Sequence, residues 1–128
     1  MTDAVVLDAS AVLALIRGEP GAGEVERLDG APYLSAVNAM EVLIVLGRAG
    51  LTASRARAVL DALHFQVIPF VPGLVGRAAD VHAKSRRRGL SLADAICLAT
   101  AAALDAVVYT ADAAWRRLDV GVDIRLIR

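Results

Sequence analysis

Cysteine, lysine and aromatic residues are scarce in this chain of 128 residues. The single cysteine, Cys97, cannot form a disulfide within the chain, which suits a reducing compartment. Because Cys97 lies in an apolar run, we expect a small buried side chain rather than a nucleophile. Aromatic residues make up 4% and hydrophobic residues 57%, so the core must be built from Ala, Val, Leu and Ile. This composition excludes intrinsic disorder.

Long uninterrupted apolar runs are also missing from the sequence. The runs that exist are too short, or too broken by charge, to span a bilayer. No basic segment precedes an apolar stretch in the manner of a secretory signal peptide. We therefore expect a cytoplasmic protein with no membrane association.

An excess of positive charge is absent as well, because 14 basic residues balance 14 acidic ones. A domain that binds nucleic acid through its overall charge would be basic. Any RNA binding must therefore use a local cluster of basic side chains. Lys84 is the only lysine, and the remaining basic residues are arginines, whose planar forks suit phosphate groups.

Short apolar segments alternate with helix-like segments along the whole chain, and the loops between them leave no room for a domain boundary. Strands are expected at residues 4–7, 33–35, 66–70, 106–109 and 122–127. Helices are expected at residues 10–17, 22–29, 36–48, 52–64, 73–87, 91–104 and 113–118. We predict a single α/β domain over residues 1–128, with a mainly parallel central sheet flanked by helices in a three-layer sandwich.

Two acidic residues directly follow predicted strands. Asp8 follows the first strand, and Asp112 follows the strand that ends at Thr110. In open parallel sheets, ligands bind beyond the carboxyl ends of the strands. Each residue also has a purely structural interpretation, because Asp, Ser and Thr before a helix act as N-caps. Asp8 or Ser10 could cap one helix, and Thr110 or Asp112 another.

Two further acidic residues lie in helical segments among apolar neighbours. Ser91-Leu-Ala-Asp94 is a capping box, but Asp94 also shares a helix face with Cys97, where a carboxylate needs a partner. Glu41 caps nothing and has no basic residue three or four positions away. Its structural alternative is a solvated edge residue, or one paired with a distant arginine.

One hypothesis accounts for all four carboxylates, namely that they converge at the strand ends and bind a divalent cation. Carboxylates that lie close together repel, so without a cation some would have to take up protons. Oxygen ligands suit Mg²⁺, and no His/Cys cluster indicates zinc. A bound metal ion can activate water and neutralise charge on a scissile phosphate. The sequence has no Ser/His/Asp or Cys/His set and no Gly-rich phosphate loop.

Four motifs occur in sequence order: Val-Leu-Asp8-Ala-Ser10-Ala, Asn38-Ala-Met-Glu41, Ser91-Leu-Ala-Asp94-Ala and Thr110-Ala-Asp112. Together they resemble the PIN-domain nucleases, and among them the VapC-type toxins of bacterial toxin–antitoxin modules. The resemblance spans essentially the whole chain and implies an endoribonuclease that depends on Mg²⁺ or Mn²⁺. The implied metal-binding and catalytic residues are Asp8, Glu41, Asp94 and Asp112.

The same resemblance implies supporting residues and partners. Ser10 and Thr110 match small hydroxyl positions near the metal. Asn38 departs from the pattern, because relatives often carry threonine there, although an amide could still orient a carboxylate. Such toxins are usually homodimers that act on RNA. A small antitoxin of the VapB type occupies their active groove through its C-terminal segment.

Basic residues flank the predicted site in the sequence. Arg86, Arg87 and Arg88 precede the helix that carries Asp94, and Arg116 closely follows Asp112. We expect these arginines to contact RNA phosphates. The alternative for the arginine run is a solvated helix end, where basic residues favour the helix dipole. The apolar faces of helices 36–48 and 52–64 belong to the core, and any exposed stripe could serve the dimer or the antitoxin.

Two other functional classes compete with this interpretation. A receiver domain or a haloacid-dehalogenase-like phosphatase would also combine Mg²⁺ with an α/β sheet. A receiver, however, needs a lysine after a late strand, and such a phosphatase needs a second aspartate where Ser10 stands. A non-catalytic PIN-like module that binds RNA or an antitoxin is the second alternative, and the intact carboxylate set argues against it.

Overall fold

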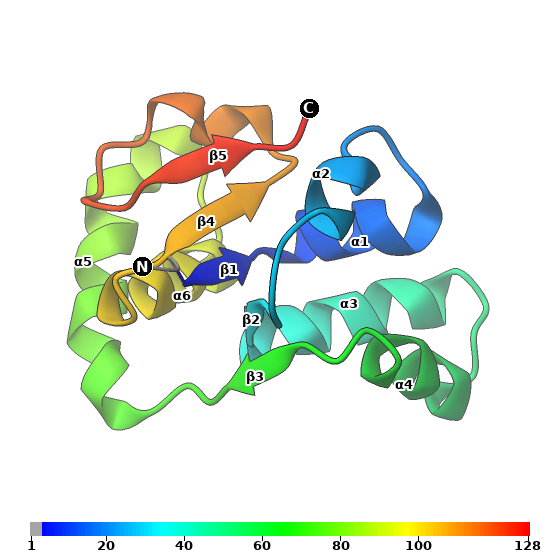
Figure 1. Cartoon of the computed structure of the whole chain (residues 1–128). Helices are drawn as coiled ribbons and strands as arrows, with labels where there is room; N and C mark the ends of the chain where they lie inside the picture. Colours follow the sequence, from blue (N-terminus) through cyan, green and yellow to red (C-terminus); the bar gives the residue numbers. More distant parts are fainter. Residues whose placement is uncertain (1–3) are drawn as a thin grey trace.

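A computed structural model describes residues 4–128, in which short strands alternate with helices (Figure 1). The strands are β1 (Val5–Leu7), β2 (Tyr33–Ser35), β3 (Gln66–Ile68), β4 (Val107–Thr110) and β5 (Ile124–Leu126). The α-helices are α1 (Ala9–Arg17), α2 (Ala22–Glu26), α3 (Ala36–Arg48), α4 (Ala53–Asp61), α5 (Val75–Ser85) and α6 (Leu92–Ala103). Three 3₁₀ helices complete the fold: η1 (Pro72–Leu74), η2 (Arg86–Arg88) and η3 (Ala113–Arg117). The predicted alternation of strands and helices is confirmed.

The five strands form one parallel sheet in the order β3-β2-β1-β4-β5. The central strand β1 pairs with β2 through Val6 and Tyr33, and with β4 through Val6 and Val108. The chain leaves β1 toward β2 but leaves β4 toward β5, so successive connections diverge between β1 and β4. Ligands bind at such a switch point in open α/β sheets. Asp8 and Asp112 follow these two strands.

Helices cover both faces of the sheet, which gives the predicted three layers. Neighbouring residues of β1 point to opposite faces, so Leu7 joins the core under α1 to α4 and Val6 joins the core under α5 and α6. Figure 1 shows α5 and α6 on one side of the strands and α1 to α4 on the other. None of the helices within residues 4–128 has the length and apolar character needed to cross a bilayer.

Side-chain caps fix where four helices begin. Asp8, Ser35, Thr52 and Ser91 are the N-caps of α1, α3, α4 and α6, and each side chain accepts a bond from a first-turn amide. Helix α1 ends at Gly18, whose left-handed backbone (φ 64°) suits glycine at a C-cap. The caps at the start of α1, α3 and α6 all lie close to the predicted site, so local folding and site geometry depend on the same side chains.

Several predicted segments are shorter in the structure, among them the helices predicted over 22–29 and 52–64, which are α2 and α4. The helix predicted over 73–87 ends at Ser85, whose hydroxyl bonds to the carbonyl of Val81 over 2.6 Å, and Arg86–Arg88 form η2 instead. The strand predicted over 66–70 ends at Ile68, because Pro69 has no amide proton for the ladder. The last predicted strand, 122–127, is reduced to β5.

Candidate metal centre

Asp8 lies directly after β1 and is 4% exposed. Its Oδ1 accepts hydrogen bonds from Ser10 Oγ at 2.7 Å and from the Ala11 amide at 2.9 Å. Its Oδ2 accepts a bond from Thr110 Oγ1 at 2.7 Å. A carboxylate has about four lone-pair positions, and the hydrogen bonds of Asp8 use two on Oδ1 and one on Oδ2.

Burial raises the pKa of Asp8 from 3.8 to about 6. The hydrogen bonds from Thr110, Ala11 and Ser10 act in the opposite direction, while the negative charge of Asp94 adds to the rise. The three ion pairs that form among residues 4–128 involve other side chains. The ionised form of Asp8 is therefore poorly compensated by the protein, and a cation beside Oδ2 would stabilise it.

Two hydroxyl groups tie the loop after β1 to the loop after β4. Ser10 Oγ and Thr110 Oγ1 lie 3.2 Å apart, and Ser10 Oγ accepts a bond from the Ala111 amide at 2.9 Å. Thr110 Oγ1 in turn accepts a bond from the Asp112 amide at 3.0 Å. The backbone that carries Asp112 is thus held to Asp8 through Thr110.

Glu41 is half-buried on α3, and its partner is an amide. Asn38, one turn earlier on the helix, donates from Nδ2 to Glu41 Oε1 at 2.7 Å. Asn38 is itself 1% exposed, and its Oδ1 accepts a bond from Ser35 Oγ at 2.9 Å. The amide of Asn38 thus orients a carboxylate as its motif allowed, whereas Ser35 was not among the predicted residues. The signal was present, because Ser35 and Asn38 have the spacing of an N-cap and the third residue of its helix.

Asp94 and Asp112 both cap helices, as the structural interpretation of their motifs predicted. The Ser91 amide bonds to Asp94 Oδ2 at 3.0 Å and the Asp94 amide bonds to Ser91 Oγ, which completes the capping box of α6. Asp112 is exposed, and its Oδ1 accepts a bond from the Ala114 amide at 2.9 Å as the N-cap of η3. Each cap engages one carboxylate oxygen, so capping does not exclude a second role for the other oxygen.

The fully buried thiol of Cys97 lies near three of the four predicted carboxylates. Burial raises its pKa, and the negative charges of Asp8, Asp94 and Glu41 raise it further. The expectation of a buried, unreactive cysteine therefore agrees with its environment. The charges of Asp8, Glu41 and Asp94 all act on Cys97, so these carboxylates lie in one region of the fold, whereas Asp112 is connected to Asp8 through Thr110.

The chemistry of these donors fits a hard cation. They are all oxygen atoms, which Mg²⁺ and Mn²⁺ prefer. Within residues 4–128, no three His, Cys, Asp or Glu side chains gather closely enough to hold a metal ion by themselves. Mg²⁺ does not require such a set, because it is usually bound by one or two carboxylates together with water and substrate phosphate. Asp8 and Asp94 are the candidate pair, because the charge of Asp94 acts on Asp8.

The predicted RNA-binding arginines lie beside this group in the chain and are all exposed. Arg86–Arg88 form η2, which is separated by Gly89 and Leu90 from the cap of α6 at Ser91. Arg116 lies in η3, the helix that Asp112 caps. Each arginine run is thus connected to a predicted carboxylate by a short segment.

This combination of a parallel five-stranded sheet and carboxylates at its switch point defines a recognised class of protein. The model of the PIN domain family matches residues 5–121, and the chain belongs to that family. The predicted resemblance to PIN-domain proteins is therefore confirmed. No curated protein matches the sequence.

Solved structures similar to this chain include toxin–antitoxin proteins. A toxin–antitoxin complex from Klebsiella pneumoniae superposes with a TM-score of 0.77 at 19% identity over 98% of both chains. DNA-bound VapBC from Salmonella typhimurium superposes with a TM-score of 0.75 at 18% identity over 100% of both chains. VapC20 of Mycobacterium tuberculosis is a toxin that cleaves the sarcin–ricin loop. It superposes with a TM-score of 0.72 at 19% identity over 86% of this chain and 91% of the VapC20 chain. At these identities the likeness establishes the fold.

Proposed function

We propose that this chain is a metal-dependent endoribonuclease and the toxin of a toxin–antitoxin pair. The observation that carries the proposal is the buried carboxylate of Asp8 at the switch point, with a pKa raised to about 6 and a single hydrogen-bond partner on Oδ2. Membership of the PIN domain family favours a nuclease over a receiver or a phosphatase. The toxin–antitoxin relatives, among them one named for RNA cleavage, support the same assignment.

In this proposal Asp8 and Asp94 hold the cation, which is Mg²⁺ or Mn²⁺. A cation held there would lower the pKa of a coordinated water and would neutralise charge on the scissile phosphate. Ser10 and Thr110 fix the orientation of Asp8 through their hydroxyl groups. Glu41 is held at Oε1 by Asn38, so its second oxygen is left to orient the attacking water. Asp112 contributes its second oxygen from the exposed side of the site.

RNA binding needs positive charge that the carboxylates do not supply. The exposed arginines of η2 and Arg116 of η3 are proposed to contact phosphates on either side of the scissile bond. Charged guanidinium groups form paired hydrogen bonds with phosphate oxygens, and they reduce the repulsion between the RNA and the acidic site.

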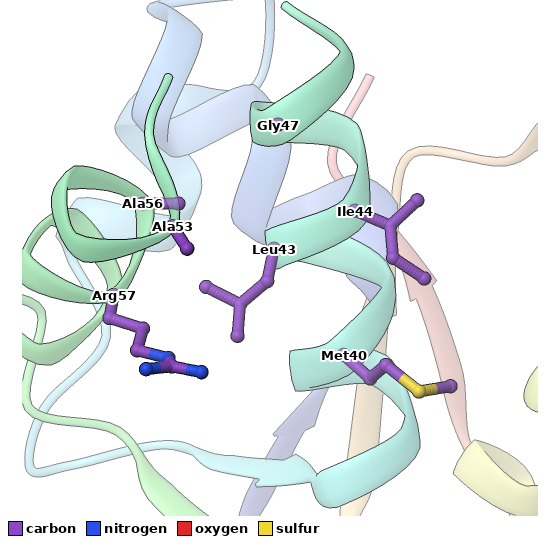
Figure 2. Close-up of a pocket in the computed structure, with 7 residues that line it drawn as sticks. All are labelled: Met40, Leu43, Ile44, Gly47, Ala53, Ala56 and Arg57. Atoms are coloured by element: carbon purple, nitrogen blue, oxygen red, sulfur yellow. The ribbon is translucent and has the colours of Figure 1, made fainter. Parts of the chain in front are cut away.

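A groove between α3 and α4 is the proposed position of the antitoxin. It has a volume of about 250 Å³ and is lined by Met40, Leu43, Ile44, Gly47, Ala53, Ala56 and Arg57. Figure 2 shows Leu43 and Arg57 directed toward each other between the two helices. Met40 is 53% exposed and precedes Glu41 on α3. A partner segment with an apolar face and an acidic residue opposite Arg57 would complement this groove.

A different surface is proposed for the homodimer. Its lining has no charged side chain and consists of Phe70, Val75, Ala78, Ala79, Leu92, Ala95 and Ile96. Leu92 is 70% exposed and Val75 is 54% exposed. A two-fold interface places the same patch on both subunits, so an uncharged patch pairs with itself without repulsion. The α3–α4 groove would instead bring two Arg57 side chains toward each other, which favours a different partner there.

The test is cleavage of labelled RNA by the purified chain with Mg²⁺, with Mn²⁺ and with EDTA. We expect cleavage with either metal and none with EDTA. Asp8→Asn and Asp94→Asn should abolish cleavage, and Asp119→Asn, a change at an exposed residue outside the site, should not. Unchanged cleavage by the Asp8→Asn protein would contradict the proposal. RNA binding without cleavage by the wild-type protein would favour the non-catalytic alternative.

A further inference from the structure

Ser35 and Asn38 form a closed hydrogen-bonded ring at the start of α3. The Asn38 amide donates to Ser35 Oγ at 3.0 Å, and Ser35 Oγ donates to Asn38 Oδ1 at 2.9 Å. Both residues are 1% exposed. The Ser35 oxygen already accepts the backbone proton of Asn38, so its own proton is left to point at Oδ1. The two ends of the Asn38 side chain are therefore distinguished, and Nδ2 faces Glu41.

A neighbouring group must hold the Asn38 amide in one orientation, whereas a hydroxyl at the same position would not need this. A threonine hydroxyl rotates freely and can donate or accept as its surroundings require. The oxygen and nitrogen of an amide are fixed in role, and a flip of the Asn38 side chain would turn Oδ1 toward the carboxylate of Glu41. Two acceptors would then face each other in a half-buried place, which costs free energy.

We propose that Ser35 is a positioning residue of the metal site, and that it acts through Asn38 on Glu41. Its hydroxyl selects the amide orientation that holds Glu41 Oε1 at 2.7 Å and thereby limits the rotation of a flexible side chain. This inference rests on the proposed function for its consequence at the metal, while the orientation of the amide is testable without any metal. It adds to the site a residue that lies outside the carboxylates and their immediate partners.

Ser35 is also the N-cap of α3, so the two roles must be separated. Ser35→Ala removes both the cap acceptor and the donor to Oδ1. Ser35→Thr keeps both, because threonine also caps helices. Asn38→Ala keeps the cap bond to Ser35 Oγ, and it removes the side-chain bonds from Ser35 and to Glu41. Thr52→Ala is a matched control, because it removes the N-cap of α4, which has no connection to the carboxylates.

The first measurement is hydrogen exchange of the Asn38 side-chain amide by NMR, in metal-free protein. We expect slow exchange in the wild type and in Ser35→Thr, and exchange at least about ten-fold faster in Ser35→Ala, because the released amide samples both orientations. Thr52→Ala should leave the Asn38 amide unchanged. Equal exchange in the wild type and Ser35→Ala would overturn the proposal.

The second measurement is Mn²⁺ affinity by electron paramagnetic resonance. Loss of a residue that orients a ligand weakens metal binding about 10- to 100-fold. We expect such a loss in Ser35→Ala and in Asn38→Ala, and no additional loss in the double variant, because the serine acts through the amide. Additive losses of Mn²⁺ affinity would show that Ser35 does not act through Asn38, and would overturn the proposal. If the wild type neither binds Mn²⁺ nor cleaves RNA, the proposed function fails, and the exchange measurement still decides whether Ser35 orients Asn38.

Discussion

Thr110 Oγ1 donates to Asp8 Oδ2 over 2.7 Å, and this bond joins residues 102 positions apart in the sequence. The two residues lie at the ends of neighbouring strands β4 and β1. Thr110 is fully buried, and its hydroxyl also accepts the Asp112 amide. One hydroxyl group therefore sets the environment of Asp8 and holds the loop that carries Asp112.

Replacing Thr110 with valine should shift the pH dependence of RNA cleavage. The Thr110 hydrogen bond lowers the pKa of Asp8, so its loss should raise that pKa further. Ionised Asp8 would then form only at higher pH, and the acidic limb of the rate profile should move upward. Leaving the buried partners unsatisfied should also cost roughly 1–3 kcal/mol of stability.

The matched control for this prediction is Thr100→Val. Thr100 is also buried, and its hydroxyl bonds to the carbonyl of Ile96 within α6. It should lose stability without a shift of the pH profile. An unshifted acidic limb in Thr110→Val would show that this hydrogen bond does not control Asp8.

Asp8 should make the metal-free protein less stable as the pH rises. Its pKa is about 6 in the folded state and 3.8 without that environment, so the folded state binds more protons between these values. The stabilising contribution is present at low pH and is lost as the pH rises through about 6. A difference of about two pKa units corresponds to roughly 3 kcal/mol.

Urea unfolding in EDTA between pH 4 and pH 8 measures this effect. Asp8→Asn should be less sensitive to pH than the wild type and more stable than the wild type at pH 8. Added Mg²⁺ at pH 8 should stabilise the wild type, because binding to the folded state alone favours that state, and should stabilise the variant less. Parallel stability curves for the two proteins would contradict the assignment of the raised pKa to Asp8.

Changing Arg86, Arg87 and Arg88 together to alanine should weaken RNA binding in a manner that depends on salt. Loss of three phosphate contacts should reduce the slope of log affinity against log salt by about two for single-stranded RNA. Fluorescence anisotropy with labelled RNA, in the presence of Ca²⁺ or in an inactive variant, measures this slope. The control is Arg55→Ala, an exposed arginine on α4. Equal salt slopes for the triple variant and the control would show that the arginines of η2 face solvent and do not contact RNA.

Reversing the charge of Arg57 should weaken binding of the proposed antitoxin without loss of RNA cleavage. Arg57 lines the α3–α4 groove, whereas Arg55, two positions earlier on α4, points to a different face of the helix. We expect Arg57→Glu to weaken the complex at least about ten-fold, the cost of one interfacial charge pair. Arg55→Glu should have little effect. The affinities of both variants are measured by calorimetry with the proposed antitoxin, the protein encoded by the gene next to that of this chain. Equal affinities would show that this partner binds outside the α3–α4 groove.

The local elements of this fold were predictable because the signals for them are local. The apolar run before Asp8 and the capping box at Ser91 mark where a strand ends and where a helix begins, and both agree with the structure. The break between α5 and η2 was not predicted. It depends on a hydroxyl of Ser85 that bonds to the backbone of Val81, and a serine inside a helical pattern gives little warning of this.

The residues of the candidate site were proposed from the sequence, and the structure adds the hydrogen bonds that hold them. The sequence indicated that Asp8, Glu41 and Asp94 need a common explanation, and the structure brings their charges around Cys97. The sequence predicted that the Asn38 amide could orient a carboxylate, and the structure bonds it to Glu41, but the contribution of Ser35 was not predicted. The roles of Asp8, Glu41, Asp94 and Asp112 as metal ligands stay predictions.

Sequence alone determined the α/β alternation, the parallel sheet and the placement of Asp8 and Asp112 after strands. These follow from periodicity and capping, which act over a few residues. Only the tertiary structure decided which carboxylates share a neighbourhood and which hydroxyl and amide groups hold them. The physical reason is that strand order and helix packing are set by the burial of two cores, and contacts between distant segments leave no periodic trace in the chain.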